Sequence, residues 1–101
     1  MVNRIEWSQT ATIELGQILT YLRFEVSYQT ALNFNESLQK RIALLETNKI
    51  EGRPVLNRKS IRFILLGKHH RIYYRRHGLT LYITRLYDTR QNIEKKPYGE
   101  K

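Results

Sequence analysis

The chain has 101 residues, no cysteine and a formal net charge of +9. This length suits one domain with a modest core, and the lack of cysteine excludes a disulfide framework or a thiolate zinc site. Arg4 and Glu6 interrupt the region where a signal peptide needs an apolar core, and the longest apolar run, residues 63–66, is far too short to span a membrane. We therefore expect a single cytoplasmic domain over residues 1–101 with no membrane partner.

The net positive charge of the chain comes from its second half. Residues 1–51 contain five Lys or Arg against six acidic residues, whereas residues 52–101 contain thirteen against three. Clustering of this kind predicts a polyanionic partner, either nucleic acid or an acidic protein segment. The alternative is that the basic surface serves solubility alone.

The N-terminal half is expected to form a strand followed by two helices. Residues 2–7 alternate in polarity, which is typical of a half-buried strand, and Ser8 can cap a helix over about residues 9–23. Ser27 can cap a second helix. The apolar stripe of that second helix consists of Ala31, Phe34, Leu38, Ile42 and Leu45. Because the link between the helices is short, we expect them to fold back as a hairpin.

The second half is expected to form an antiparallel meander. Gly52 and Pro54 end the helical half, and residues 55–60 are interpreted as an ordered connector. Three strand candidates follow over residues 61–66, 69–76 and 79–87, separated by two short glycine-containing turns. The predicted fold class is α+β, with an N-terminal strand, a helical hairpin and a three-stranded antiparallel sheet whose one face carries the helices. The tail, residues 93–101, is expected to be loosely held.

Alternation divides the middle strand of the meander into an apolar face and a basic face. His70, Ile72 and Tyr74 fall on the first, and Arg71, Tyr73 and Arg75 on the second. An aromatic ring between two arginines can hold phosphates and stack bases. We expect Arg62 and Arg85 on neighbouring strands to join this basic surface, and the alternative is an ordinary solvated face.

Two histidines are the candidates for proton transfer. An RNA-cleaving site needs a proton acceptor, cations for the phosphate and an acid for the leaving oxygen, and arginine supplies only the cations. His69 and His70 have a suitable pKa range, but adjacent strand residues face opposite ways, so only one of them can serve a given site. With His77 they lack metal-ligand spacing, so neither a metal nor a cofactor is expected.

The last strand ends in the sequence "YDTRQN", residues 87–92. Asp88, Thr89 and Asn92 can bond nearby backbone, as such side chains do where a strand stops. This explanation leaves Arg90 without an evident local partner. We therefore interpret Asp88 and Arg90 as further members of a binding surface.

Four segments in order resemble the RelE/ParE superfamily of bacterial toxins. They are "IEWS", "ILTYLRFEVSYQTALNFNESLQKRIALLE", "GRP" and "IRFILLGKHHRIYYRRHGLTLYITRLYDTRQN", and together they cover nearly the whole chain. The most specific parts are "GKHHRIYYRR" and the terminal Asp-Thr-Arg-Gln-Asn, which is similar to the version found in plasmid-stabilisation toxins. The resemblance implies a toxin of a type II toxin–antitoxin module, which inhibits growth and is neutralised by an acidic antitoxin.

The superfamily contains two mechanisms. RelE-like members cleave mRNA on the ribosome with a cluster of Lys and Arg and a C-terminal Tyr, whereas ParE-like members lack that cluster and inhibit DNA gyrase. The resemblance assigns to the cluster Arg71, Arg90 and Arg62, with Tyr98 as a looser match to the tyrosine.

The second basic position expected on the strand of Arg62 is occupied by Ile64. This departure and the long helical hairpin favour the ParE-like branch. Some ribonuclease members use histidine, so His69 or His70 could supply the missing function and a ribosome-dependent endoribonuclease is the alternative. A plain nucleic-acid-binding module is the third possibility.

Overall fold

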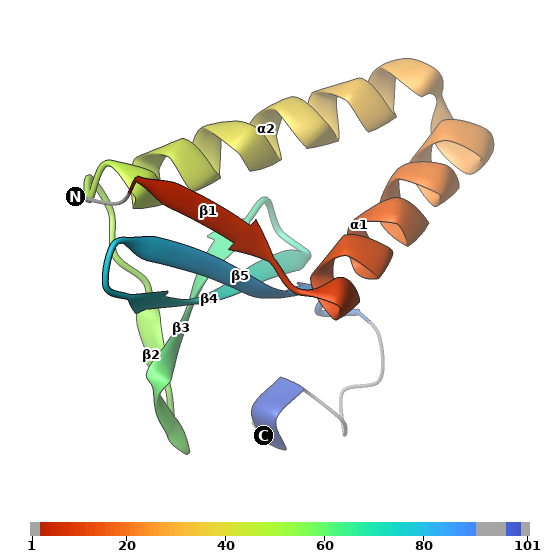
Figure 1. Ribbon diagram of the computed structural model, residues 1–101. Coiled ribbons are helices and arrows are strands. Elements are labelled where there is room, and N and C mark those ends of the chain that lie inside the picture. The colour runs from red at the N-terminus through yellow and green to blue at the C-terminus, as the bar shows by residue number, and fades with distance from the viewer. Residues whose placement is uncertain (1–2, 91–96, 100–101) are drawn as a thin grey trace.

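The computed structural model of the protein describes residues 3–90 and 97–99. A five-stranded sheet in the order β1-β5-β4-β3-β2 carries two helices on one face (Figure 1). The elements are β1 Arg4–Trp7, α1 Gln9–Tyr21, a π-helical turn Leu22–Val26, α2 Tyr28–Glu46, β2 Arg53–Val55, β3 Arg58–Leu66, β4 His70–His77, β5 Thr80–Asp88 and a 3₁₀ turn Pro97–Gly99. The predicted α+β class and the helical hairpin are confirmed.

Both predicted helix caps are present. The Ser8 hydroxyl accepts a hydrogen bond from the Ala11 amide at 2.9 Å, and the Ser27 hydroxyl accepts one from the Thr30 amide at 3.0 Å. The first helix is α-helical only to Tyr21, where the chain continues as the π-helical turn. The two helices meet at this turn and spread apart from it across the sheet (Figure 1).

The meander is confirmed, and the sheet has two further strands. Strands β3, β4 and β5 pair antiparallel in sequence order, while β1 pairs parallel with β5. The interpretation of residues 55–60 as a connector was partly wrong, because β2 pairs antiparallel with the start of β3 and Val55 lies opposite Arg58. Tertiary packing stabilises this short strand, since Val55 is buried in one cluster with Tyr73 and Tyr87.

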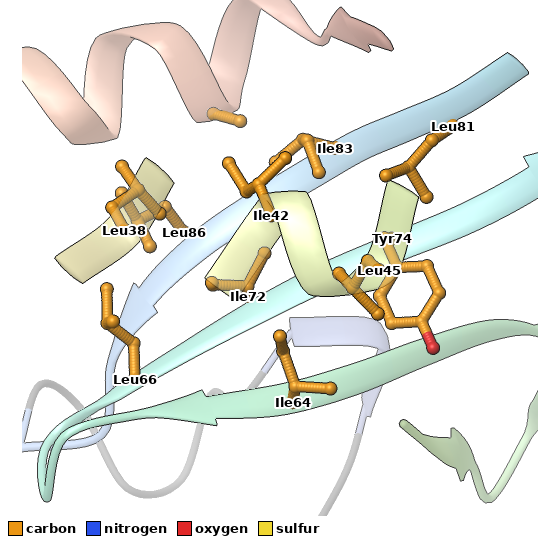
Figure 2. Close-up of a cluster of buried hydrophobic side chains, with 11 residues drawn as sticks. Leu38, Ile42, Leu45, Ile64, Leu66, Ile72, Tyr74, Leu81, Ile83 and Leu86 are labelled. Atoms are coloured by element: carbon orange, nitrogen blue, oxygen red, sulfur yellow. The ribbon is translucent and has the colours of Figure 1, made fainter. Parts of the chain in front are cut away.

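The main core lies between the helices and the sheet. Its buried side chains come from both helices and from three strands, as Figure 2 shows. They are Ala11 on α1, Leu38, Ile42 and Leu45 on α2, Ile64 and Leu66 on β3, Ile72 and Tyr74 on β4, and Leu81, Ile83 and Leu86 on β5. This face of the sheet is called the helix face below. No helix within residues 3–90 and 97–99 is long and apolar enough to cross a membrane.

A second, smaller cluster lies on the other face of the sheet, called the open face below. It consists of Val55, Ile61, Tyr73 and Tyr87, with Phe63 and Tyr98 packed against it. The Pro97–Gly99 turn thus lies over the open face, although it belongs to a tail that was expected to be loosely held. Residues 93–96, 100 and 101 of that tail lie outside the described residues.

Candidate functional site

The open face carries a group of arginines on three neighbouring strands. Residues paired across strands share a face, and the register pairs Arg53 with Phe63 and Phe63 with Tyr73. By the same rule Arg58 lies on the face of Val55, and alternation along β4 adds two more arginines beside Tyr73. These four residues, Arg53, Arg58, Arg71 and Arg75, are called the basic open face below.

Aromatic rings hold three of these guanidinium groups in place. Arg71 lies 4.2 Å from the centre of the Phe63 ring, Arg75 lies 4.3 Å from that of Tyr82, and Arg58 lies 6.0 Å from that of Tyr98. Arg71 also donates a hydrogen bond to the Tyr73 hydroxyl at 3.2 Å. Stacking of this kind limits the conformations of a long side chain, so the cations are already oriented before a partner binds.

The expectation that bases stack on Tyr73 was wrong. The Tyr73 side chain is 0% exposed, because Phe63 and Tyr98 pack on its ring with centres 5.6 and 5.4 Å away. The Tyr98 hydroxyl donates to the Thr84 hydroxyl at 2.6 Å, which fixes the C-terminal turn over the sheet. Tyr73 is therefore part of the structure that supports the arginines.

Arg62 does not lie on the open face, contrary to expectation, whereas Arg85 lies opposite Tyr73 on that face but is bound to Glu14. Arg62 pairs with Tyr74 on the helix face, donates to the Gly52 carbonyl at 2.7 Å and lies 3.7 Å from Glu51. Arg85 forms a two-point ion pair with Glu14, with nitrogen–oxygen distances of 2.7 and 3.0 Å. The hydrogen bonds that Arg85 donates to the Glu14 carboxylate raise the pKa of Arg85. Both cations are compensated within the protein.

A cleft of about 380 Å³ forms a second candidate site, between α1 and the ends of β4 and β5. Its apolar lining comes from Ile18, Leu22 and Leu86. Its polar lining consists of Glu14, Gln17, Tyr21, His70, Asp88 and Arg90. The cleft therefore combines an apolar floor with both signs of charge.

Asp88 is the local partner of Arg90, so the interpretation of Arg90 as a residue without one was wrong. One Asp88 oxygen accepts the Arg90 backbone amide at 2.8 Å and the Arg90 Nε at 3.1 Å, and the other accepts Nη2 at 2.8 Å. These hydrogen bonds lower the pKa of Asp88. The Thr89 amide donates to the His69 carbonyl. Asp88 and Thr89 therefore bond nearby backbone where β5 ends, as the sequence predicted for these two residues.

His70 lines the cleft as a largely buried imidazole. Its side chain is 13% exposed, its Nε2 lies 3.8 Å from Asp88, and the Phe34 ring packs edge-on with centres 4.9 Å apart. Burial lowers the pKa of His70, and the weaker attraction of Asp88, which Arg90 already binds, opposes this. His70 is therefore neutral at pH 7. His69 is exposed on the surface and contributes its carbonyl to the strand end.

The structure does not bring the five candidate catalytic residues together. Arg71 and Tyr98 meet at Tyr73 on the open face, while His70 and Arg90 meet at Asp88 in the cleft. Arg62 lies in a third place, beside Gly52 on the helix face.

The strand next to Arg71 carries apolar side chains on the open face. Ile64 is in the main core, so a basic residue there could not reach Arg71. Among the β3 residues that share the face of Arg71, Leu65 is its direct cross-strand partner and Phe63 supplies the ring on which it stacks. Alternation with Ile64 and Leu66 was the signal in the sequence that could have placed Arg62 on the helix face.

Two further cations and one acid escaped the sequence-based prediction. Arg53 and Arg58 belong to the basic open face, and they were missed because their segment was interpreted as a connector. Glu14 was missed because nothing in a helix sequence shows which strand it meets. Residues 53–59 do contain a signal, since three basic residues and no acid flank Val55.

Solved toxin structures share this fold. The toxin of a chromosomal ParDE system from P. aeruginosa superposes with a TM-score of 0.71 at 19% identity, covering 84% of this chain and 94% of that one. A chain of the E. coli DinJ-YafQ complex gives 0.65 at 15% identity, covering 86% and 94%. A YoeB/ParE toxin from Agrobacterium tumefaciens gives 0.65 at 13% identity, covering 85% and 98%. The fold is that of small bacterial toxins.

The sequence comparison defines the family. Residues 5–93 match the family described as the ParE toxin of the type II toxin–antitoxin system parDE. Because this match covers most of the chain, the protein belongs to the ParE toxin family of type II toxin–antitoxin systems. Among curated protein sequences, none is similar enough to count as a match.

Proposed function

We propose that this toxin inhibits DNA gyrase through a binding surface and does not cleave RNA. The observation that carries the proposal is the apolar character of the β3 side chains that flank Arg71. A ribonuclease of the RelE type would need basic side chains on that neighbouring strand, and the β3 residues that flank Arg71 are Leu65, its cross-strand partner, and Phe63, on whose ring it stacks. Neither side chain can accept a proton or stabilise a phosphate.

The separation of the remaining polar groups supports the same conclusion. A general base must come within about 3 Å of the proton that it abstracts. His70 lines the cleft, whereas Arg71 and Tyr98 lie on the opposite face of the sheet. One substrate phosphate cannot contact both groups while the strands remain paired. A gyrase inhibitor needs only a complementary surface, which does not require the groups to converge.

We further propose that an acidic antitoxin neutralises the protein by covering the basic open face. The motivating observation is that Arg53, Arg58 and Arg75 make no ion pair within residues 3–90 and 97–99. An antitoxin that supplies carboxylates to these oriented cations forms charge-assisted hydrogen bonds. Such a module would stabilise a plasmid, because cells that lose the antitoxin gene stop growing.

The decisive experiment exposes two targets to the same purified protein. One reaction is a gyrase supercoiling assay, and the other contains translating ribosomes programmed with a defined mRNA. Blocked supercoiling with intact mRNA supports gyrase inhibition. Codon-phased cuts in the mRNA with normal supercoiling would overturn it, and so would a failure of both assays to respond.

A ribosome-dependent endoribonuclease is the second candidate, and the cleft is the observation that favours it. A neutral imidazole and the partly exposed Arg90 lie on either side of Asp88. If the cleft cleaves RNA, His70→Gln should abolish the mRNA cuts because it removes the proton carrier, and Arg90→Ala should do so because the loss of one preorganised cation costs about 10²-fold or more in rate. Arg71→Gln, on the other face, is the matched control.

Growth measurements test the assignment as a toxin independently of the target. Induced expression should stop bacterial growth, and coexpression of the acidic protein encoded beside it should restore growth. Normal growth in cells that contain soluble, folded protein would contradict the assignment.

A further inference from the structure

The β2–β3 hairpin carries a basic tip that no acidic side chain within residues 3–90 and 97–99 compensates. Its turn and flanks, residues 53–60, contain Arg53, Arg58 and Lys59 and no acidic residue. All three side chains are exposed, and none forms an ion pair in the described parts of the chain. Three cations within seven residues repel one another, so the arrangement costs stability unless an anion binds.

An apolar side chain stands at the end of the same hairpin. Leu56 is 87% exposed, more than any other large apolar side chain among the described residues. Single exposed leucines are common on protein surfaces, but this one lies between the cations. A two-stranded ribbon with cations along its sides and an apolar residue at its tip is complementary to a groove that has anionic walls and apolar groups at its base.

The hairpin is held firmly at its base. Val55 and Ile61 are both buried in the open-face cluster, one from each strand, and Arg58 lies over the Tyr98 ring. The hairpin therefore projects from the sheet as an ordered two-stranded ribbon, away from the helices (Figure 1). An ordered element loses little conformational entropy when it binds.

We propose that the β2–β3 hairpin binds duplex DNA by entering its major groove. The major groove of B-form DNA admits a two-stranded β-ribbon, whereas the deep, narrow major groove of duplex RNA does not. Arg53, Arg58 and Lys59 contact phosphates on the groove walls. Leu56 contacts apolar base edges on the floor, where each thymine presents a methyl group.

The rest of the basic open face extends this contact. Arg53 pairs across the strands with Phe63, and Arg71 stacks on that same ring, so the charge of the hairpin continues onto the sheet. Duplex DNA that is bound to the hairpin therefore also contacts arginines of the adjoining sheet. The binding does not depend on gyrase, and direct DNA binding and gyrase inhibition can succeed or fail separately.

Binding of a labelled 20-base-pair duplex, followed by fluorescence anisotropy from 50 to 200 mM salt, tests the proposal. Each phosphate contact contributes about −0.9 to the slope of log affinity against log salt. The triple variant Arg53→Gln, Arg58→Gln, Lys59→Gln should flatten the slope by about 2.7, which removes about a 40-fold dependence over this salt range. Leu56→Ser should weaken binding and leave the slope unchanged, because it removes no charge.

A charge-matched variant separates a specific site from the overall positive field. Arg4→Gln, Arg23→Gln, Lys40→Gln also removes three exposed cations, but from β1 and the helical hairpin. The proposal requires this control to bind with nearly the parent slope. Equal slopes for the two triple variants would overturn it, as would the absence of DNA binding at 50 mM salt. Tighter binding of duplex RNA would also overturn it.

Discussion

Glu14 binds both the side chain of Arg85 and the backbone amide of Leu86, so one carboxylate joins the first helix to the last strand. The Arg85 Nη2 donates to one oxygen at 2.7 Å, and the Leu86 amide donates to the other at 2.9 Å. Strand β1 pairs with β5 only as far as Ile83, so Leu86 lies beyond the end of its parallel neighbour. Glu14 thus accepts the hydrogen bond of a β5 amide at a position where β1 no longer pairs with β5.

Replacement of Glu14 by Ala should destabilise the fold by about 2–3 kcal/mol, because it removes a charge-assisted hydrogen bond and leaves a partly buried amide without its acceptor. Urea unfolding measures the change. Glu36, which pairs with Lys40 at 3.2 Å on the exposed surface of α2, supplies the control, and Glu36→Ala should cost at most about 0.5 kcal/mol. Similar costs for the two substitutions would show that Glu14 has no special role.

His70 should make the fold less stable as the pH falls below 6.5. Burial lowers the pKa of His70 in the folded state, whereas the unfolded chain takes up the proton near the ordinary value of 6.5. The unfolded state therefore binds more protons between 6.5 and the folded pKa, and stability is lost across that window. Unfolding at pH 7.5 and 5.5 should show a drop that His70→Gln reduces.

The neighbouring His69 is the control for this titration, because its side chain is exposed. His69→Gln should keep the drop between pH 7.5 and 5.5. The pKa of Asp88 is lowered below 3.8, so the contribution of Asp88 is lost only at lower pH, outside this window. A histidine resonance of His70 that titrates at or above 6.5 would rule out the burial argument.

Gly52 should not tolerate a side chain, whereas Gly16 should. A Cβ atom on Gly52 would overlap the Phe63 carbonyl, and the Gly52 amide donates to the Tyr74 hydroxyl at 2.6 Å. Gly52→Ala should therefore cost about 1–3 kcal/mol, as overpacking does. Gly16 has open space around its Cα on an exposed turn of α1, and Gly16→Ala should stabilise the helix by up to about 1 kcal/mol. Thermal unfolding of both variants should show shifts of opposite sign.

Arg75→Ala should weaken the toxin while it changes stability little. Arg75 lies on the basic open face over the Tyr82 ring, a contact worth about 0.5–1 kcal/mol at exposed sites. If that face binds the target, the concentration for half-inhibition of gyrase should rise several-fold, with the melting temperature nearly unchanged. Lys40→Ala removes the same charge from the helices and should leave inhibition at the parent level. An unchanged inhibitory concentration for Arg75→Ala would remove this residue from the binding surface.

The sequence determined the elements that depend on neighbours along the chain. Ser8 and Ser27 cap their helices because each hydroxyl meets an amide three residues ahead. Gly67 and Gly78 allow tight turns because their φ values of 63° and 58° favour a residue without a Cβ atom. Charge could likewise be located in the second half of the chain from the order of residues alone. Each of these signals depends only on the order of residues along the chain, so it can be recognised without knowledge of the fold.

Only the tertiary structure decided which side chains lie together. The strand register places Arg62 on the helix face and Arg71 on the open face, and Arg85 binds Glu14, 71 residues earlier in the chain. The burial of Tyr73 depends on Tyr98, which returns from the C-terminal end of the chain to cover it. A shift of one residue in register moves every side chain of a strand to the other face, and an ion pair forms with whatever charge the fold brings near. For these reasons the sequence identified the basic residues of this toxin, and the packed sheet decided which of them form a surface.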